Sequence, residues 1–255
     1  MTKLLASVRS AIEARQAIAG GADIIDLKEP AMGALGRLPD ATIGEILQAV
    51  GGRRPCSATI GDMELLPQQV LDAVRHMAAA GVDIVKFGMF DGDAPGTLAA
   101  LGAAARSGLR LVAVLFADRA PDFDLIDHCA YAGLYGIMLD TADKRGGPLT
   151  THLSRAALAG FVRRGRERGL LTGLAGSLSV RDVPDLLTLV PDYLGFRSAL
   201  AAGGRTGELD PAAVARLRAL LDPASSSRAT AAAGAQSAAA AATVSSAAAT
   251  TVSNP

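Results

Sequence analysis

The stretch "SAIEARQAIAGGADIIDLK", residues 10–28, holds the helix-to-strand unit that decides the fold. Ser10 with Glu13 three residues later has the form of a capping box, which opens a helix. Gly20 and Gly21 are typical of the end of that helix, and the apolar run at 22–28 predicts a strand buried on both faces. A helix leading into such a strand is the repeating element of an α/β protein.

The same unit recurs along the chain. Short runs rich in β-branched or apolar residues alternate with helical patterns and predict eight strands, at 3–8, 22–28, 56–61, 82–88, 110–117, 133–140, 170–176 and 193–198. Eight strand–helix units in about 220 residues predict a single (β/α)8 TIM barrel. A doubly wound open sheet is the alternative, but no GxGxxG follows the first strand.

A change in composition divides the chain into two parts. Residues 1–222 form the predicted catalytic barrel, whereas residues 223–255 are a low-complexity tail of mostly Ala, Ser and Thr. Such a segment cannot bury enough apolar area to offset the entropy of ordering it. We therefore expect a disordered C-terminal tail that carries no chemistry.

The overall composition narrows the class of partner. With 25 basic and 25 acidic residues the formal net charge is zero, which does not favour nucleic acid and leaves a small-molecule substrate. Two cysteines fit a reducing cytoplasm, and three scattered histidines do not predict a metal site. No window holds the roughly 20 strongly apolar residues that span a bilayer. Barrels of this size often associate, so we expect a homo-oligomer.

Charged side chains follow several of the predicted strands, and in a barrel all strand ends meet at one face, where active sites lie. Alternation places Asp26 and Lys28 on the same side of their strand, facing the barrel mouth. The residues predicted at this mouth are Asp26, Lys28, Lys86, Asp140, Lys144 and Arg197.

Each of these residues also has a structural interpretation. Lys28 could be a solvated strand end, Lys86 an ion-pair partner of Asp26, Asp140 a loop cap, and Lys144 part of a solvated loop. Their common position at one mouth weakens these interpretations jointly. Crowded ammonium groups lower one another's pKa, and a lysine shifted from 10.4 to about 7 gains roughly a thousandfold in neutral amine. A neutral lysine can form a Schiff base, with a second lysine or an aspartate as the acid–base group.

Small-residue turns after the seventh and eighth strands predict an anion site. The turns are "LAGSLS" and "FRSALAAGGRTG", and this barrel fold commonly holds phosphate there on exposed backbone amides. The candidate phosphate-binding residues are Gly176, Ser177, Arg197, Ser198, Ala199, Gly203 and Gly204. Ordinary loops would show the same residues, so this alternative stays open.

The segments "GGADIIDLKEPAMGALG", "SATIGD", "DIVKFG", "MLDTADK", "LAGS" and "GFRSA" together resemble the (5-formylfuran-3-yl)methyl phosphate synthase family of methanofuran biosynthesis. The resemblance runs from the first strand to about Leu220. It implies a condensation of two molecules of glyceraldehyde 3-phosphate, with release of phosphate and water. We expect no metal or organic cofactor, because a lysine imine would itself serve as the electron sink. The sequence departs from the archaeal-type pattern in the loop "EPAMGALG" and in a short connection between the fourth and fifth strands.

The resemblance also implies roles that the residue pattern alone leaves unranked. Lys28 would carry the Schiff base and Lys86 would accept the proton, while Asp26, Asp140 and Lys144 match further active-site positions. Two other functions remain open at this stage. One is a Schiff-base aldolase acting on a phosphosugar, and the other is a non-catalytic barrel in which the lysines only neutralise a bound phosphometabolite.

Overall fold

Eight parallel strands pair in chain order and close into a barrel, because β8 also pairs with β1. This computed structural model describes residues 1–222, so the predicted tail at 223–255 lies outside the described residues. The closed ring confirms the barrel and excludes the doubly wound open sheet. The strands are β1 (Lys3–Val8), β2 (Ile24–Leu27), β3 (Cys56–Thr59), β4 (Ile84–Gly88), β5 (Arg110–Phe116), β6 (Gly136–Asp140), β7 (Leu171–Leu174) and β8 (Tyr193–Phe196).

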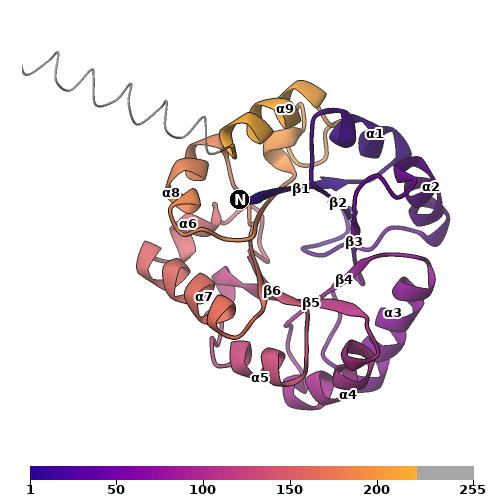
Figure 1. Cartoon of the computed structure of the whole chain (residues 1–255), viewed down its shortest axis with the longest axis vertical. Coiled ribbons are helices and arrows are strands. Elements are labelled where there is room, and N and C mark those ends of the chain that lie inside the picture. The colour runs from indigo at the N-terminus through magenta and orange to yellow at the C-terminus, as the bar shows by residue number, and fades with distance from the viewer. Residues whose placement is uncertain (223–255) are drawn as a thin grey trace, which may run out of the picture.

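Helices surround the strands on the outside, as Figure 1 shows in a view along the barrel. They are α1 (Ala11–Ala19), α2 (Asp40–Val50), α3 (Pro67–Ala79), α4 (Ala94–Arg106), α5 (Leu125–Tyr131), α6 (Leu149–His152), α7 (Arg155–Glu167), α8 (Val183–Leu187) and α9 (Pro211–Leu220). Three short 3-10 helices, η1 (Ala117–Arg119), η2 (Val180–Asp182) and η3 (Ser198–Leu200), lie in the loops. Within residues 1–222 no helix is long and apolar enough to cross a membrane.

The strand predictions are confirmed in number and position, but most were too long. Only β1 matches its predicted bounds, whereas β2 ends at Leu27 and β7 at Leu174. Lys28, Gly176 and Ser198 therefore lie just beyond their strands, where the chain turns away from its neighbours. Functional residues in a barrel are commonly found in these turns.

The predicted start and end of the first helix are confirmed in part. The Ser10 side chain accepts a hydrogen bond from the Glu13 amide, and Gly21 ends α1 with a φ of 89°. The predicted return contact of the capping box is wrong, because the Glu13 carboxylate accepts from the Arg9 amide instead, at 2.9 Å. Glu13 is buried, and its carboxylate also forms an ion pair with Arg197, which follows β8.

The core has two layers that lie on opposite sides of the strands. A large cluster fills the space between strands and helices, and a smaller one, which includes Leu5, Ile84, Val112 and Tyr193, fills the barrel interior. Gly173 makes room for Tyr193, since a Cβ on Gly173 would lie 2.1 Å from the Tyr193 ring. This apolar plug closes the amino-terminal part of the barrel, so the opposite mouth is left for polar residues.

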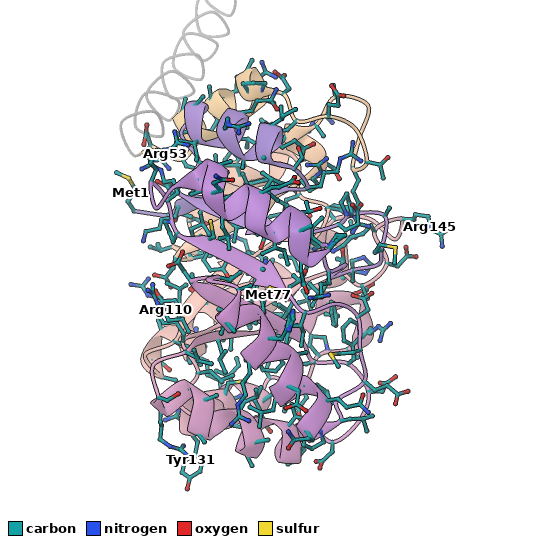
Figure 2. The ribbon with its side chains drawn as sticks, turned by 90° about the vertical axis from the view of Figure 1, so that its right-hand side faces the viewer. Met1, Arg53, Met77, Arg110, Tyr131 and Arg145 are labelled. Atoms are coloured by element: carbon teal, nitrogen blue, oxygen red, sulfur yellow. The ribbon has the colours of Figure 1, made fainter. Side chains whose placement is uncertain are left out.

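Figure 2 shows the two ends of the barrel in side view. Met1 and Arg110, which precede or begin strands, lie at one end, and Arg145, in the loop after β6, lies at the other. The carboxyl ends of the strands thus share the end marked by Arg145.

Candidate active site

A polar layer lies inside the barrel above the apolar plug. Ser7, Asp26 and Ser57 are directly opposite one another on β1, β2 and β3. Asp26 is 1% exposed and accepts hydrogen bonds from Ser7 Oγ at 2.8 Å and Ser57 Oγ at 2.7 Å. The predicted inward direction of Asp26 is confirmed, and the two hydroxyls fix its carboxylate in place.

Asp26 forms an ion pair with Lys86 of β4, with Nζ and Oδ1 separated by 2.6 Å. Burial lowers the pKa of Lys86 below the ordinary value of a lysine, although the charge of Asp26 opposes this shift. Burial by itself would raise the pKa of Asp26, but Lys86 and Lys28 outweigh it and lower that pKa. Asp26 is therefore a fixed carboxylate, and Lys86 is an ammonium that gives up its proton more readily than a free lysine.

A second carboxylate, Asp140 at the end of β6, binds two lysines. Lys28 Nζ lies 3.2 Å from Oδ2, and Lys144 Nζ contacts Oδ1, which also accepts from the Thr141 amide at 2.8 Å. Burial opposes ionisation of Asp140, but the charges of Lys144 and Lys28 hold its pKa well below its usual range. Asp140 thus draws two lysines from separate loops to one point.

The two lysines on Asp140 differ in how firmly they are held. Lys144 Nζ also donates to the Thr141 carbonyl, whereas Lys28 Nζ has Asp140 as its one acceptor among residues 1–222. Burial and the neighbouring Lys28 charge lower the pKa of Lys144 to about 8, against the attraction of Asp140. Lys28 is therefore the amine with most freedom to react.

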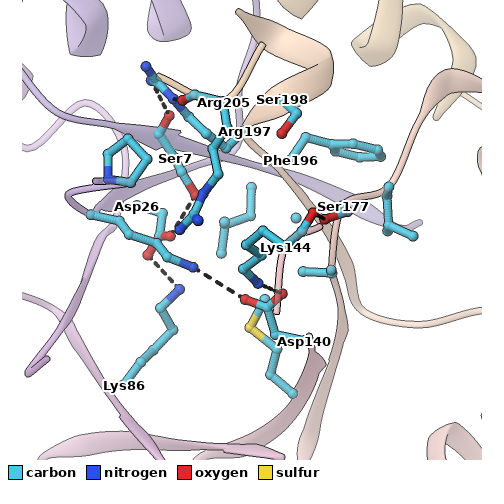
Figure 3. A pocket seen from close by; sticks show the side chains of 18 residues that line it. Ser7, Asp26, Lys86, Asp140, Lys144, Ser177, Phe196, Arg197, Ser198 and Arg205 are labelled. Atoms are coloured by element: carbon cyan, nitrogen blue, oxygen red, sulfur yellow. Dashed lines mark hydrogen bonds and ion pairs between the residues drawn. The ribbon is translucent and has the colours of Figure 1, made fainter. Parts of the chain in front are cut away.

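These groups line a pocket with an empty volume of about 540 Å³, including its open mouth. Figure 3 shows Asp26 with Lys86 and Asp140 with Lys144 inside it, and Arg197 and Arg205 on the side away from Lys86. Gly176, Ser177, Arg197 and Ser198 of the predicted anion site also line the pocket. Ala199, Gly203 and Gly204 belong to the same loop after β8 but do not line it.

Of the purely structural interpretations, the structure contradicts those of Lys28 and Lys144 and contains the contacts expected for Lys86 and Asp140. Lys28 is not a solvated strand end, because it is 9% exposed, and the Lys144 side chain is 12% exposed rather than solvated. The Lys86–Asp26 ion pair and the turn contact of Asp140 are both present. Within residues 1–222 no group of three or more His, Cys, Asp or Glu side chains is placed to hold a metal ion.

Comparison with known proteins gives the family. A sequence profile described as 4-HFC-P synthase matches residues 4–218. The chain belongs to this family. A (5-formylfuran-3-yl)methyl phosphate synthase from Archaeoglobus fulgidus is 34% identical over 84% of this chain and 97% of that protein. A Methylorubrum extorquens protein that carries the synthase name provisionally is 43% identical over 84% of this chain and 89% of its own length. The protein is thus an enzyme of the 4-HFC-P synthase family.

Solved structures support the fold of this synthase family member. Phosphoribosyl anthranilate isomerase from Thermus thermophilus aligns with a TM-score of 0.63 at 16% identity, over 86% of this chain and 98% of that one. The 3-hexulose-6-phosphate synthase of Salmonella typhimurium aligns with a TM-score of 0.62 at 16% identity, over 87% and 100%. At this identity the likeness shows a shared barrel and nothing of the chemistry.

Sequence reasoning missed four residues of the candidate site: Ser7, Ser57, Glu13 and Arg205. Strand alternation could have predicted that the two serines face into the barrel, but their position beside Asp26 depends on the register between strands. Glu13 was assigned to the capping box alone. Arg205 lies in "GGRTG", where the glycines predicted a phosphate site made of backbone amides, so the Arg205 guanidinium was not considered as a ligand.

Arg197 occupies the pocket wall, but its guanidinium is fully engaged within the protein. A guanidinium has five N–H donors, and Arg197 makes five hydrogen bonds with them. Two go to the Glu13 carboxylate at 2.6 and 3.0 Å, and the others go to the carbonyls of Ser7, Arg205 and Gly207 at 3.1, 2.8 and 2.6 Å. Arg197 therefore ties β1, α1 and the loop after β8 together.

Loss of Arg197 is expected to destabilise the synthase barrel. Arg197→Met removes five hydrogen bonds and leaves the buried Glu13 carboxylate with Arg9, 3.6 Å away, as its remaining cation. This costs roughly 3 kcal/mol and lowers the melting temperature on the order of 10 °C. Thermal unfolding followed by circular dichroism measures this shift. The double variant Glu13→Gln with Arg197→Met removes the stranded charge and recovers part of the loss. A single variant that melts within about 2 °C of the wild type would contradict this role.

Proposed function

We propose that this enzyme makes (5-formylfuran-3-yl)methyl phosphate from two molecules of glyceraldehyde 3-phosphate through a Schiff base on Lys28. The observation that carries the proposal is the cluster of Lys28, Lys86 and Lys144 around Asp26 and Asp140 in one pocket of a chain belonging to this family. The atoms balance when each pair of triose phosphates loses one phosphate and two waters. No external oxidant or reductant is needed.

Lys28 is the best placed of the three lysines to carry the imine. Its Nζ has one acceptor, at 3.2 Å, whereas Lys86 is 2% exposed in a tight ion pair and Lys144 has several acceptors. The Lys28 amine adds to the triose carbonyl carbon, and loss of the carbonyl oxygen as water forms the C=N bond. Protonated, this iminium withdraws electrons from the neighbouring carbon and makes its proton acidic.

Lys86 and Lys144 then move protons. Lys86 in its neutral form removes the proton from the carbon next to the imine, and fixed Asp26 stabilises the ammonium that results. Lys144, with a pKa of about 8, is mostly protonated at neutral pH and can protonate a departing oxygen. The electron pair left by the proton forms the enamine and expels phosphate from the next carbon.

The product name fixes which carbon atoms are joined. The phosphate-bearing CH2 is attached to a ring carbon that has ring carbons on both sides. The new carbon–carbon bond therefore joins the central carbon of the triose that keeps its phosphate to the carbon from which the other triose has lost phosphate. The central carbon gives up its own proton to a base, and the electron pair left behind adds to the unsaturated iminium on Lys28. Ring closure through a hydroxyl and loss of two waters give the aromatic furan, whose stability favours the overall reaction. Hydrolysis of the Lys28 C=N bond consumes the water released when the imine formed and frees the product aldehyde.

The loops after β7 and β8 are the proposed phosphate cradle. Gly176 has a φ of 104°, and a Cβ there would lie 2.9 Å from the Thr141 amide, so the turn requires glycine. The turn brings Gly176 and Ser177 to the pocket wall, which Ser198 at the start of η3 also lines. Backbone N–H groups at such turns bind phosphate oxygens.

Reductive trapping tests the proposal. The enzyme is incubated with glyceraldehyde 3-phosphate and borohydride, and peptides are analysed by mass spectrometry while an unreduced sample is assayed for phosphate and furan aldehyde. We expect a reduced triose adduct on Lys28 and one phosphate released for each furan formed. An adduct without phosphate release would favour a phosphosugar aldolase. Binding with neither signal would identify a non-catalytic phosphometabolite-binding barrel.

A further inference from the structure

The charged side chains of the pocket do not balance. Five cations line it, Lys28, Lys86, Lys144, Arg197 and Arg205, against two carboxylates, Asp26 and Asp140. A third carboxylate, Glu13, pairs with Arg197 from behind the wall. With all lysines protonated, the side chains that line the pocket carry an excess of positive charge even after Glu13 is counted, and this excess favours a phosphate dianion.

Arg205 is the guanidinium that carries part of this excess. Lys86 is paired with Asp26, Lys28 and Lys144 share Asp140, and Arg197 is paired with Glu13. In the part of the chain that the structure describes, no carboxylate lies within ion-pair distance of Arg205. Its one hydrogen bond in this part runs from Nη2 to the Gly33 carbonyl at 2.7 Å.

The backbone that carries Arg205 is fixed, although its side chain is weakly held. Arg197 donates to the carbonyls of Arg205 and Gly207 at 2.8 and 2.6 Å. The loop is closed by the Ala202 amide, which donates to the Glu208 carbonyl at 2.9 Å. The two arginines are thus placed for different tasks, since Arg197 positions the loop and leaves the Arg205 guanidinium free for a ligand.

The direction of the Arg205 side chain brings it across the mouth of the pocket. It starts in the loop after β8 and reaches Gly33 in the loop after β2, five residues beyond Lys28. Asp62 holds that second loop by accepting from the Ala34 and Leu35 amides at 2.8 and 2.6 Å. A phosphate dianion accepts from a guanidinium more strongly than a neutral carbonyl does, and can take two parallel hydrogen bonds.

We propose that Arg205, and not Arg197, is the side chain that binds the phosphate of the triose substrate. The guanidinium exchanges its hydrogen bond to Gly33 for phosphate oxygens and holds the anion beside the cradle formed by Gly176, Ser177 and Ser198. Arg205 lies close enough to the reacting groups for this role, because its positive charge contributes to lowering the pKa of Lys144. This assignment rests on the proposed function for the identity of the substrate.

Steady-state kinetics of Arg205→Met with glyceraldehyde 3-phosphate test the assignment. Loss of a charged hydrogen-bonding pair should raise KM roughly ten- to a hundredfold, with a much smaller change in kcat. Arg205→Lys keeps the charge but not the two parallel donors, so its KM should lie between the two. Arg145→Met is the matched control, because Arg145 lies at the same end of the barrel with a side chain 94% exposed. It should leave KM unchanged.

Calorimetric titration with inorganic phosphate separates this assignment from the proposed reaction. Wild-type enzyme and Arg145→Met should bind phosphate, and Arg205→Met should bind it at least tenfold more weakly, whether or not furan is formed. The melting temperature of Arg205→Met should match the wild type, since one hydrogen bond is lost. Unchanged phosphate affinity and KM, or a fall in kcat with KM unchanged, would overturn the assignment.

Discussion

Lys28→Ala is expected to abolish furan formation, with turnover reduced by roughly 10⁴-fold or more. Without the amine no imine forms, so the proton beside the triose carbonyl keeps its ordinary low acidity and phosphate is not expelled. The expected readouts are loss of the borohydride-trapped adduct and loss of phosphate release. Asp140 keeps Lys144 as its partner in this variant, so the barrel should remain folded.

Lys28→Arg is the matched control for the charge at this position. It keeps a cation near Asp140, but a guanidinium stays protonated at neutral pH and does not form an imine. If Lys28 supplied only positive charge, this variant would retain most of the activity. Substantial turnover in Lys28→Arg, or a trapped adduct on another lysine in Lys28→Ala, would contradict the Schiff-base assignment.

The sequence predicted the barrel and much of the site for one physical reason. Strand alternation and the common direction of parallel strands determine where a side chain at a strand end lies, whatever its distance along the chain. Asp26, Lys86 and Asp140 were predicted at one mouth on this basis, and they lie in one pocket. The residue pattern left Lys28 and Lys144 unranked, because their difference lies in how many acceptors each ammonium has in the folded protein.

Loop residues were harder to predict, because their contacts depend on pairs far apart in sequence. Glu13 and Arg197 are separated by 184 positions, and nothing local to either shows that they meet. The same pair explains why Arg197 is engaged and Arg205 is available. Propensity reasoning predicts turns from glycines, but which side chain of a turn faces the pocket is decided by packing across the barrel.

Lys86→Met is expected to reduce kcat by roughly 10²- to 10⁴-fold while Lys28 can still be trapped by borohydride. The imine forms, but the base that removes the neighbouring proton is absent. That proton should no longer exchange with deuterated solvent, which mass spectrometry of the trapped peptide would show. Burial lowers the pKa of Lys86, so wild-type kcat should rise with pH as Lys86 loses its proton, and this rise should occur below the pKa of a free lysine. The variant should not show this rise in kcat with pH.

A double variant distinguishes this role from a purely structural ion pair. Lys86→Met alone leaves the Asp26 carboxylate buried with the Ser7 and Ser57 hydroxyls, which should destabilise the barrel by roughly 3–5 kcal/mol. Adding Asp26→Asn removes that charge and should recover most of the melting temperature. Activity should not return, because no amine occupies the position of Lys86. Recovery of both stability and turnover in the double variant would mean that Lys86 serves only to neutralise Asp26.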